Sequence, residues 1–108
     1  NIAVEVMDDE AEREQGLMGR EKLEEGKGMW FVFQEEKALY FWMKDMKISI
    51  DMLFLNQNKE VMKIYENVKP CQADPCVSYP SGEPAMYVLE VPAGFVQLHE
   101  VKIGDKVE

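Results

Sequence analysis

The strongest constraint on the fold is the segment at residues 41–51, Phe-Trp-Met-Lys-Asp-Met-Lys-Ile-Ser-Ile-Asp, which sets charges into strands that otherwise favour burial. Residues 39–47 and 48–55 are predicted to be strands, and residues 56–59 form a turn before residues 60–66 pair back as a hairpin. Met29–Phe33 is apolar at odd and even positions alike, which is typical of a strand covered on both faces. These patterns predict a mainly-β core.

The segments outside this core add short elements. Residues 2–6 alternate apolar and polar side chains and predict a half-buried strand, with residues 85–91 as a later one. Asp9 and Glu12 predict a capping box in which each side chain accepts from the other residue's backbone N–H, and Gly16 is placed to end this helix.

The last third of the chain contains an irregular loop and a short helix. Residues 67–84 hold four of the five prolines and both cysteines, so they are expected to form a long loop of functional or stapled character. Residues 95–101 suit a short helix. We therefore expect one domain over residues 1–108, a mainly-β, small barrel-like or jelly-roll-like sandwich of about six to eight short strands with one or two short helices.

Charge and length restrict the classes of partner. The net charge of -9 repels phosphate, which disfavours nucleic-acid and membrane-surface binding. All apolar runs are far shorter than the ~20 residues of a spanning helix, so membrane insertion by this fragment is not expected. Residue 1 is Asn rather than Met, which suggests a mature exported domain, periplasmic or on the cell surface, or a trimmed fragment. Protein partners cannot be read from these features.

Three charged residues interrupt strands that are otherwise apolar. Residues two apart on a strand share a face, and this spacing places Asp51 at the edge of the core, Glu90 at the end of an apolar row, and Lys44 after Trp42. Burying an unpaired charge costs several kcal/mol. We therefore expect Lys44, Arg13 and Arg20 to pair with the two carboxylates. Such a network either fixes the register of the sheet or lines a ligand pocket, and both interpretations stay open.

The same residues belong to a pattern that extends over nearly the whole chain. In order, its members are Glu12-Arg13-x-x-Gly16-Leu17-Met18-x-Arg20, Gly28-Met29-x-Phe31-x-Phe33, Phe41-Trp42-Met43-Lys44, Ile48-x-x-Asp51, Tyr79-x-Ser81, Tyr87-Val88-Leu89-Glu90-x-x-Ala93-Gly94 and Gly104-Asp105. The chain thereby resembles the domain-of-unknown-function family 192, an uncharacterised bacterial and archaeal group.

The resemblance implies a fold and a setting but no reaction. It implies a mainly-β, barrel-like or jelly-roll-like domain, often found behind a signal peptide or membrane anchor. By family analogy it places Tyr79 and Ser81 near the signature residues as hydrogen-bonding groups. The chain departs from the family where Asp45-Met46 replaces the usual Asn-Thr and Ser49 replaces Pro, which would alter a pocket that used those groups.

Other reactive residue types offer weaker signals. Cys71 and Cys76 favour a short disulfide staple, with a metal site or two reduced thiols as alternatives. His99 is the single histidine and lies beside no nucleophile pattern, so a catalytic triad is not supported. The eight methionines are most simply core-filling residues. We therefore predict no cofactor and no metal.

Three functions remain open. The first is a ligand-binding domain for a small polar or anionic molecule, and its candidate residues are Arg13, Arg20, Trp42, Lys44, Asp51, Tyr79, Ser81 and Glu90. The second is a structural or interaction domain in which the charges serve stability alone. The third is a hydrolase that uses Asp51 and Glu90 as a carboxylate pair, which requires both carboxyls in one cleft at roughly 5–9.5 Å.

Overall fold

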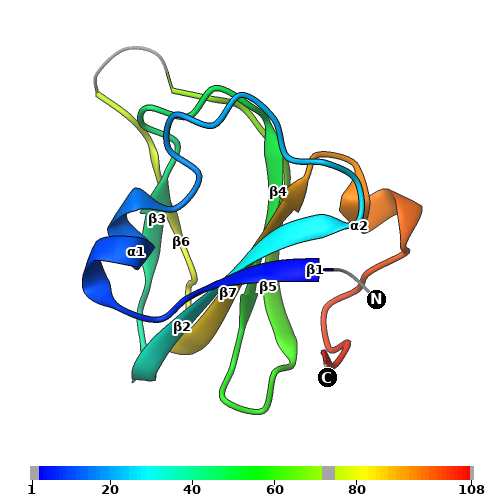
Figure 1. Cartoon of the computed structure of the whole chain (residues 1–108). Coiled ribbons are helices and arrows are strands. Elements are labelled where there is room, and N and C mark those ends of the chain that lie inside the picture. The colour runs from blue at the N-terminus through cyan, green and yellow to red at the C-terminus, as the bar shows by residue number, and fades with distance from the viewer. Residues whose placement is uncertain (1–2, 72–74, 108) are drawn as a thin grey trace.

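A computed structural model describes residues 3–71 and 75–107, within which seven strands form two sheets (Figure 1). The elements are β1 (Ala3–Met7), α1 (Glu10–Gln15), β2 (Lys27–Lys37), β3 (Tyr40–Trp42), β4 (Ile50–Leu55), β5 (Val61–Val68), β6 (Ser78–Pro80), β7 (Ala85–Pro92) and α2 (Phe95–Leu98). The mainly-β, sandwich-like prediction is confirmed. The barrel alternative is wrong, because the larger sheet is open, with β1 and β5 as its edges.

The larger sheet has the order β1-β2-β7-β4-β5, so β7 is its central strand. β4 and β5 form the predicted antiparallel hairpin, with Leu53 opposite Ile64. β1 runs parallel to β2, which requires a long crossover, and α1 with the loop that follows it supplies that connection. In the described part of the chain, no helix is both long enough and apolar enough to cross a membrane.

The smaller sheet corrects the prediction for residues 39–47. Only Tyr40–Trp42 form a strand there, and they pair with β6 in a separate two-stranded sheet. The chain turns directly afterwards, because Asp45 adopts a left-handed backbone conformation (φ +61°) and the Met46 N–H donates to the Met43 carbonyl. Lys44 therefore lies in the turn region, joined by an isolated bridge to Cys71, and not within a continuous buried strand.

The larger sheet has an apolar core on each face. One face packs against residues that follow α1 and against the β3 region, and its buried residues include Leu17, Phe31, Met43 and Met52. The other face packs against α2 and the C-terminal segment. Figure 1 shows α1, β3 and β6 on one side of the sheet and α2 on the other. All six residues of β4 are buried, as expected for a strand covered on both faces.

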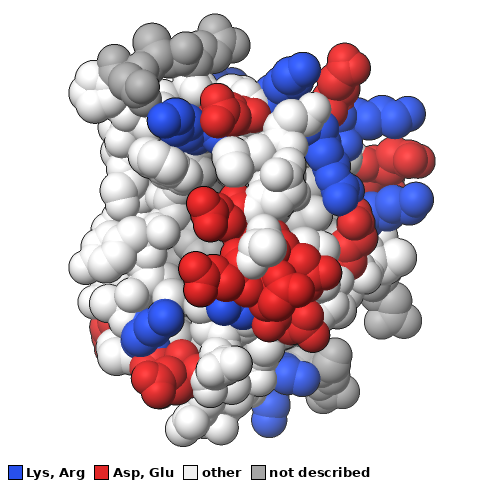
Figure 2. Space-filling model, turned by 60° about the vertical axis from the view of Figure 1, so that its left-hand side comes forward, with Lys and Arg blue, Asp and Glu red and all other residues white. Residues whose placement is uncertain are grey.

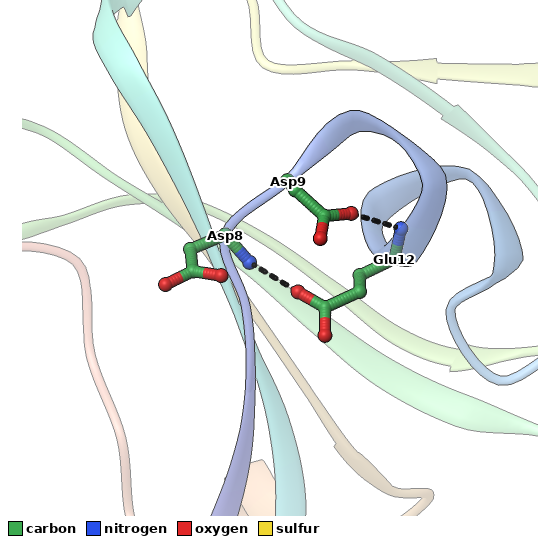
Figure 3. Close-up of side chains that lie close together, drawn as sticks. All are labelled: Asp8, Asp9 and Glu12. Atoms are coloured by element: carbon green, nitrogen blue, oxygen red, sulfur yellow. Dashed lines mark hydrogen bonds between the residues drawn. The ribbon is translucent and has the colours of Figure 1, made fainter.

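α1 begins at a cap that differs slightly from the predicted one (Figure 3). The Asp9 carboxylate accepts from the Glu12 N–H at 2.8 Å, as predicted. The Glu12 carboxylate accepts from the Asp8 N–H at 3.3 Å, whereas the prediction gave that role to the Asp9 N–H. Gly16 ends the helix at φ +46°, where an added Cβ would lie 3.2 Å from Phe31. Glycine is therefore favoured at this turn, and another residue would be strained there.

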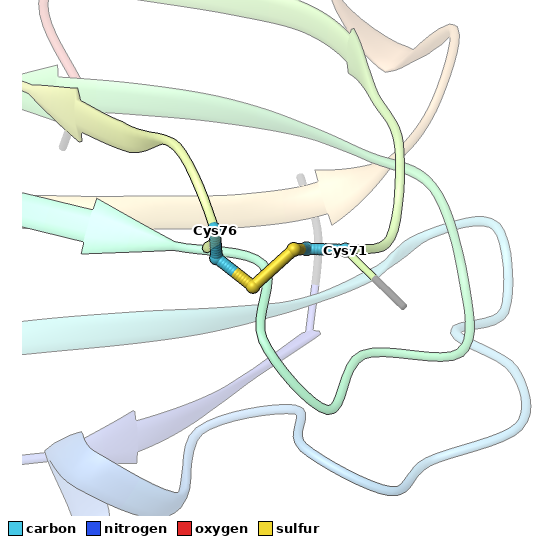
Figure 4. The surroundings of a disulfide bond; sticks show 2 residues. All are labelled: Cys71 and Cys76. Carbon is cyan, nitrogen blue, oxygen red and sulfur yellow. A yellow bond between two sulfur atoms is a disulfide. The ribbon is translucent and has the colours of Figure 1, made fainter. Parts of the chain in front are cut away.

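Cys71 and Cys76 form a disulfide in the structure, with their Cα atoms 5.8 Å apart (Figure 4). The Cys71 N–H donates to the Met43 carbonyl at 3.1 Å. The bridge thereby ties the segment before β6 to the turn that follows β3. The intervening residues 72–74 lie outside the described part of the chain.

Candidate functional site

A cleft of about 370 Å³ opens on the α1 side of the larger sheet. α1 and the turn after it form one wall, and β3 forms the other. β2 and β7 supply the floor. The lining residues that matter most are Arg13, Phe31, Phe33, Phe41, Trp42 and Glu90.

Glu90 lies at the floor of this cleft on the central strand. Its cross-strand neighbours are Met29 and Met52, both completely buried, and Glu90 itself is 5% exposed. No hydrogen bond or ion pair joins its carboxyl to any residue that the structure describes. Every fully buried side-chain oxygen and nitrogen among those residues has a partner. The unpartnered Glu90 carboxyl is therefore not fully buried, and a molecule in the cleft can contact it.

The surroundings of Glu90 change its ionisation. Burial raises the pKa of this carboxyl from 4.5 to about 8, because the charged form loses its hydration and gains no counter-ion. Glu90 is therefore mostly protonated at neutral pH. It can donate a hydrogen bond in that form, and it can accept an ion pair once a cation enters the cleft.

The two basic side chains of the cleft are held at its other end. The Arg13 guanidinium lies 4.9 Å from the centre of the Phe33 ring and donates to the Val32 carbonyl at 3.0 Å. The Lys37 ammonium lies 5.6 Å from the centre of the same ring. Both cations are thus engaged at Phe33, and neither forms the ion pair with Glu90 that the sequence predicted for Arg13.

β3 supplies the aromatic wall. Alternation along this strand sends Phe41 inward, where its ring meets those of Phe31 and Phe54 edge to face at 5.2 and 5.7 Å. Trp42 points outward and is 53% exposed. The Lys44 ammonium lies 5.2 Å from the centre of the Trp42 ring, so it adjoins the cleft without lining it.

Asp51 lies on the opposite face of the sheet from Glu90. The register pairs Asp51 with Val91 and Met52 with Glu90, and adjacent positions on a strand point to opposite faces. The Asp51 carboxylate accepts from the backbone N–H groups of Asn67 and Val96, each at 2.8 Å. The predicted cationic partners of Asp51 are therefore wrong, since backbone amides satisfy it. The predicted shared cleft for a hydrolytic carboxylate pair is also wrong.

Arg20 and Ser81 have structural partners elsewhere. Arg20 forms a two-pronged ion pair with Glu5 at the surface. The hydrogen bond from Arg20 lowers the pKa of Glu5, and the same bond raises the pKa of Arg20. The buried Ser81 hydroxyl accepts from the Leu39 N–H at 2.9 Å and donates to the Glu83 carbonyl at 2.8 Å. These contacts account for both side chains without a ligand.

Tyr79 packs beside the core rather than in the cleft. Its ring lies 5.2 Å from that of Tyr65, whose hydroxyl donates to the Pro80 carbonyl at 2.6 Å. Burial, and secondarily the nearby Tyr79, raises the pKa of Tyr65. Of the eight candidates from the sequence, the structure thus brings Arg13, Trp42 and Glu90 into one cleft, with Lys44 beside it.

Sequence reasoning missed the other aromatic and acidic members of the cleft. The Phe31-x-Phe33 spacing was a usable signal, because it puts two rings on the face of β2 that carries the cleft. Glu10 and Glu14 at the rim had no such signal, because their place depends on how α1 docks. Figure 2 shows acidic side chains gathered on the side of the molecule that carries α1.

A second hollow, of about 500 Å³, lies on the other face of the sheet. It is lined mainly by apolar side chains, with Trp30 and Phe95 among them, and by His99, whose ring packs 4.3 Å from that of Phe95. Although this hollow is larger, its lining contains no buried charge without a partner. The cleft over Glu90 is the stronger candidate site for this reason.

The fold and the cleft define a small, mainly-β domain with one buried acid beneath an aromatic wall. The model of the family DUF192, described as an uncharacterized ACR, matches residues 1–108, and the chain belongs to this family. The family implied by the sequence motifs is thereby confirmed.

The chain is similar to one curated protein in sequence and to two solved structures in sequence and fold. A UPF0127 protein of Pyrococcus furiosus is 36% identical over 63 residues, which cover 58% of this chain and about half (49%) of that relative. A crystal structure from Sinorhizobium meliloti, described provisionally as a transcription regulator, is 38% identical with a TM-score of 0.88 over 97% of this chain and 79% of that one. A protein of unknown function from Novosphingobium aromaticivorans is 32% identical with a TM-score of 0.91 over 99% of this chain and 74% of that one.

Proposed function

We propose that this chain is a small-molecule-binding domain whose site is the cleft over Glu90. The observation that carries the proposal is the carboxyl of Glu90 on the central strand. This residue is only 5% exposed, its carboxyl has no partner among the described residues, and it faces the cleft. Buried polar groups normally have hydrogen-bond partners. A buried carboxyl that has none and faces a cavity therefore marks a place where a ligand can supply the missing hydrogen bond or ion pair.

The size and lining of the cleft support a small polar ligand with an apolar part. About 370 Å³ falls within the usual range for ligand pockets, which are mostly apolar with a few convergent polar groups. Phe41 and Trp42 supply apolar surface, while Glu90 and Arg13 supply polar groups at opposite ends. This division favours a ligand that is held in one orientation.

The competing functions have less support. A carboxylate-pair hydrolase would need Asp51 and Glu90 in one cleft, and they lie on opposite faces. A purely structural role explains Asp51, Ser81 and Arg20 through their partners, but it leaves Glu90 without a reason. Direct contact with DNA is disfavoured by the net charge of -9.

An exported location is part of the proposal. The disulfide between Cys71 and Cys76 supports it, because such bonds persist mainly in oxidising compartments. Fractionation of cells that express the full-length protein, followed by thiol trapping with and without reductant, tests the location. Finding the protein in the cytosol with both thiols reduced would remove this part of the proposal.

The two tryptophans give the binding proposal a direct assay. Trp42 lies in the cleft and Trp30 lines the hollow on the other face, so their indole N–H signals in an NMR spectrum report the two sites separately. We expect titration with N-acetylglucosamine, succinate and benzyltrimethylammonium to identify at least one that shifts the Trp42 signal and leaves Trp30 unchanged. Arg20→Ala, whose side chain pairs with Glu5 and does not line the cleft, should bind that compound as the parent does. A Trp42 signal that no compound moves would contradict the proposal.

A further inference from the structure

We propose that the ligand of this cleft carries a positively charged, ammonium-type group, which pairs with Glu90 at the floor. This inference rests on the proposed binding function and names its ligand class. The sequence alone favoured a polar or anionic ligand, because it counted Arg13, Arg20 and Lys44 as a positive patch. The structure distributes those three cations differently.

The basic residues do not form an anion site. Arg20 pairs with Glu5 on the surface and does not line the cleft. Arg13 donates to a backbone carbonyl and lies over Phe33, and Lys37 lies near the same ring. An anion that reached the floor would therefore meet Glu90 without a cation beside it.

The acidic residues do converge on the cleft. Glu10 and Glu14 of α1 line its rim, and Glu90 lies beneath them. The other charged or titratable groups that face it are Arg13 of α1, Lys37 of β2 and Tyr40 of β3. With Glu90 ionised, the lining carries three acids against two bases, on a face where acidic side chains gather (Figure 2).

The aromatic lining favours the same charge. The face of an aromatic ring attracts cations through its quadrupole, most strongly for Trp. Phe33 already has two cationic side chains within 6 Å of its centre, and Lys44 lies over Trp42. A ligand cation placed between the aromatic wall and Glu90 would gain both attractions.

The pH dependence of binding separates the ligand classes. Glu90 is protonated below its pKa of about 8, so a cation that needs the carboxylate must displace that proton. Affinity for a cation should therefore rise with pH, by up to about tenfold per unit, and level off above the pKa. Affinity for an anion, which the carboxylate repels, should stay flat below the pKa and fall above it, and affinity for a neutral alcohol should stay nearly constant.

Three probes of similar size supply the test: benzyltrimethylammonium, benzyl alcohol and benzoate. Their dissociation constants are measured from the Trp42 indole signal between pH 6 and pH 9, with Trp30 as the internal control. Benzyltrimethylammonium keeps its charge throughout, so its profile reports the protein alone. We expect it to bind most tightly and to gain affinity as the pH rises.

Glu90→Gln is the decisive variant and Glu66→Gln, on the exposed surface of β5, is its matched control. We expect Glu90→Gln to weaken cation binding at pH 9 by at least about tenfold, because the variant lacks the carboxylate charge. The pH dependence of binding should also disappear. Since every other titratable group of the cleft remains, that loss would assign the pH dependence to Glu90. Glu66→Gln should bind as the parent does. Native tryptophan signals in each variant show that it is folded.

Two other results have distinct meanings. If benzoate or benzyl alcohol moves the Trp42 signal at lower concentration than the cation, or if cation affinity is flat with pH, the charge assignment is wrong while the binding function stands. If none of these probes, nor N-acetylglucosamine or succinate, moves Trp42, the binding function itself fails and the charge assignment fails with it.

Discussion

The buried carboxyl of Glu90 should make the stability of this protein depend on pH in an unusual direction. In the folded chain its pKa is raised to about 8, and in the unfolded chain it returns to about 4.5. Between these values the unfolded state has lost the proton and the folded state still holds it. Stability therefore falls as pH rises from 4.5 to 8, whereas below 4.5 both states are protonated and the contribution of Glu90 is complete.

The size of the effect follows from the shift. A displacement of about 3.5 pKa units corresponds to about 5 kcal/mol of unfolding free energy, with a slope of about 1.4 kcal/mol per pH unit. Replacing Glu90 with Gln removes the ionisation and nearly preserves the shape of the side chain. The variant should match the parent near pH 4.5 and exceed its stability by about 3–5 kcal/mol at pH 8.

The assay is urea unfolding of the parent, Glu90→Gln and Glu66→Gln at several pH values from 4.5 to 9, with the disulfide intact. The other carboxylates contribute to all three proteins, so the difference between each variant and the parent isolates one side chain. The Glu66→Gln difference should stay small and flat, because that residue is exposed. A Glu90→Gln difference that is equally flat would refute the account of Glu90 as an unpaired buried acid.

Three further variants test the structural assignments. Asp51→Asn should lower the unfolding free energy by about 2–4 kcal/mol, because the single amide oxygen cannot accept both backbone N–H groups that the carboxylate accepts. Urea unfolding measures this loss. The double variant Cys71→Ser, Cys76→Ser should lose about 2 kcal/mol, and reductant should destabilise the parent but not the variant. Gly16→Ala should lower the unfolding free energy by about 1–3 kcal/mol, because alanine is strained at this positive φ and its Cβ would crowd the Phe31 ring. Thermal or urea unfolding measures this, and unchanged stability would contradict the backbone conformation at Gly16.

The sequence predicted most strands because their patterns are local. β4 and β5 were visible as two apolar segments joined by a turn, and the helix start at Asp9 was visible from its capping residues. The error at residues 39–47 has a non-local cause. Whether Tyr40–Trp42 pair with β2 or with β6 depends on where the segment held by the disulfide lies, and spacing along the chain carries no such information.

The candidate site shows the same limit more sharply. The parity of the strands identified both Asp51 and Glu90 as buried charges, and both are buried. Parity could not say which of them has partners. The amides that satisfy Asp51 come from the end of β5 and the start of α2, 16 and 45 residues away along the chain. Their positions follow from tertiary packing alone.

The separation of these two acids depends on one residue of register. Because β4 pairs with β7 so that Met52 faces Glu90, Asp51 must point to the opposite side; a shift of one residue would have placed both carboxyls together. One face thus has an acid that stabilises the fold, while the other has an acid that lowers stability at neutral pH. A Met or Gln at position 90 would serve the fold better, so packing does not account for Glu90. The cationic ligand that we propose for the cleft would account for it.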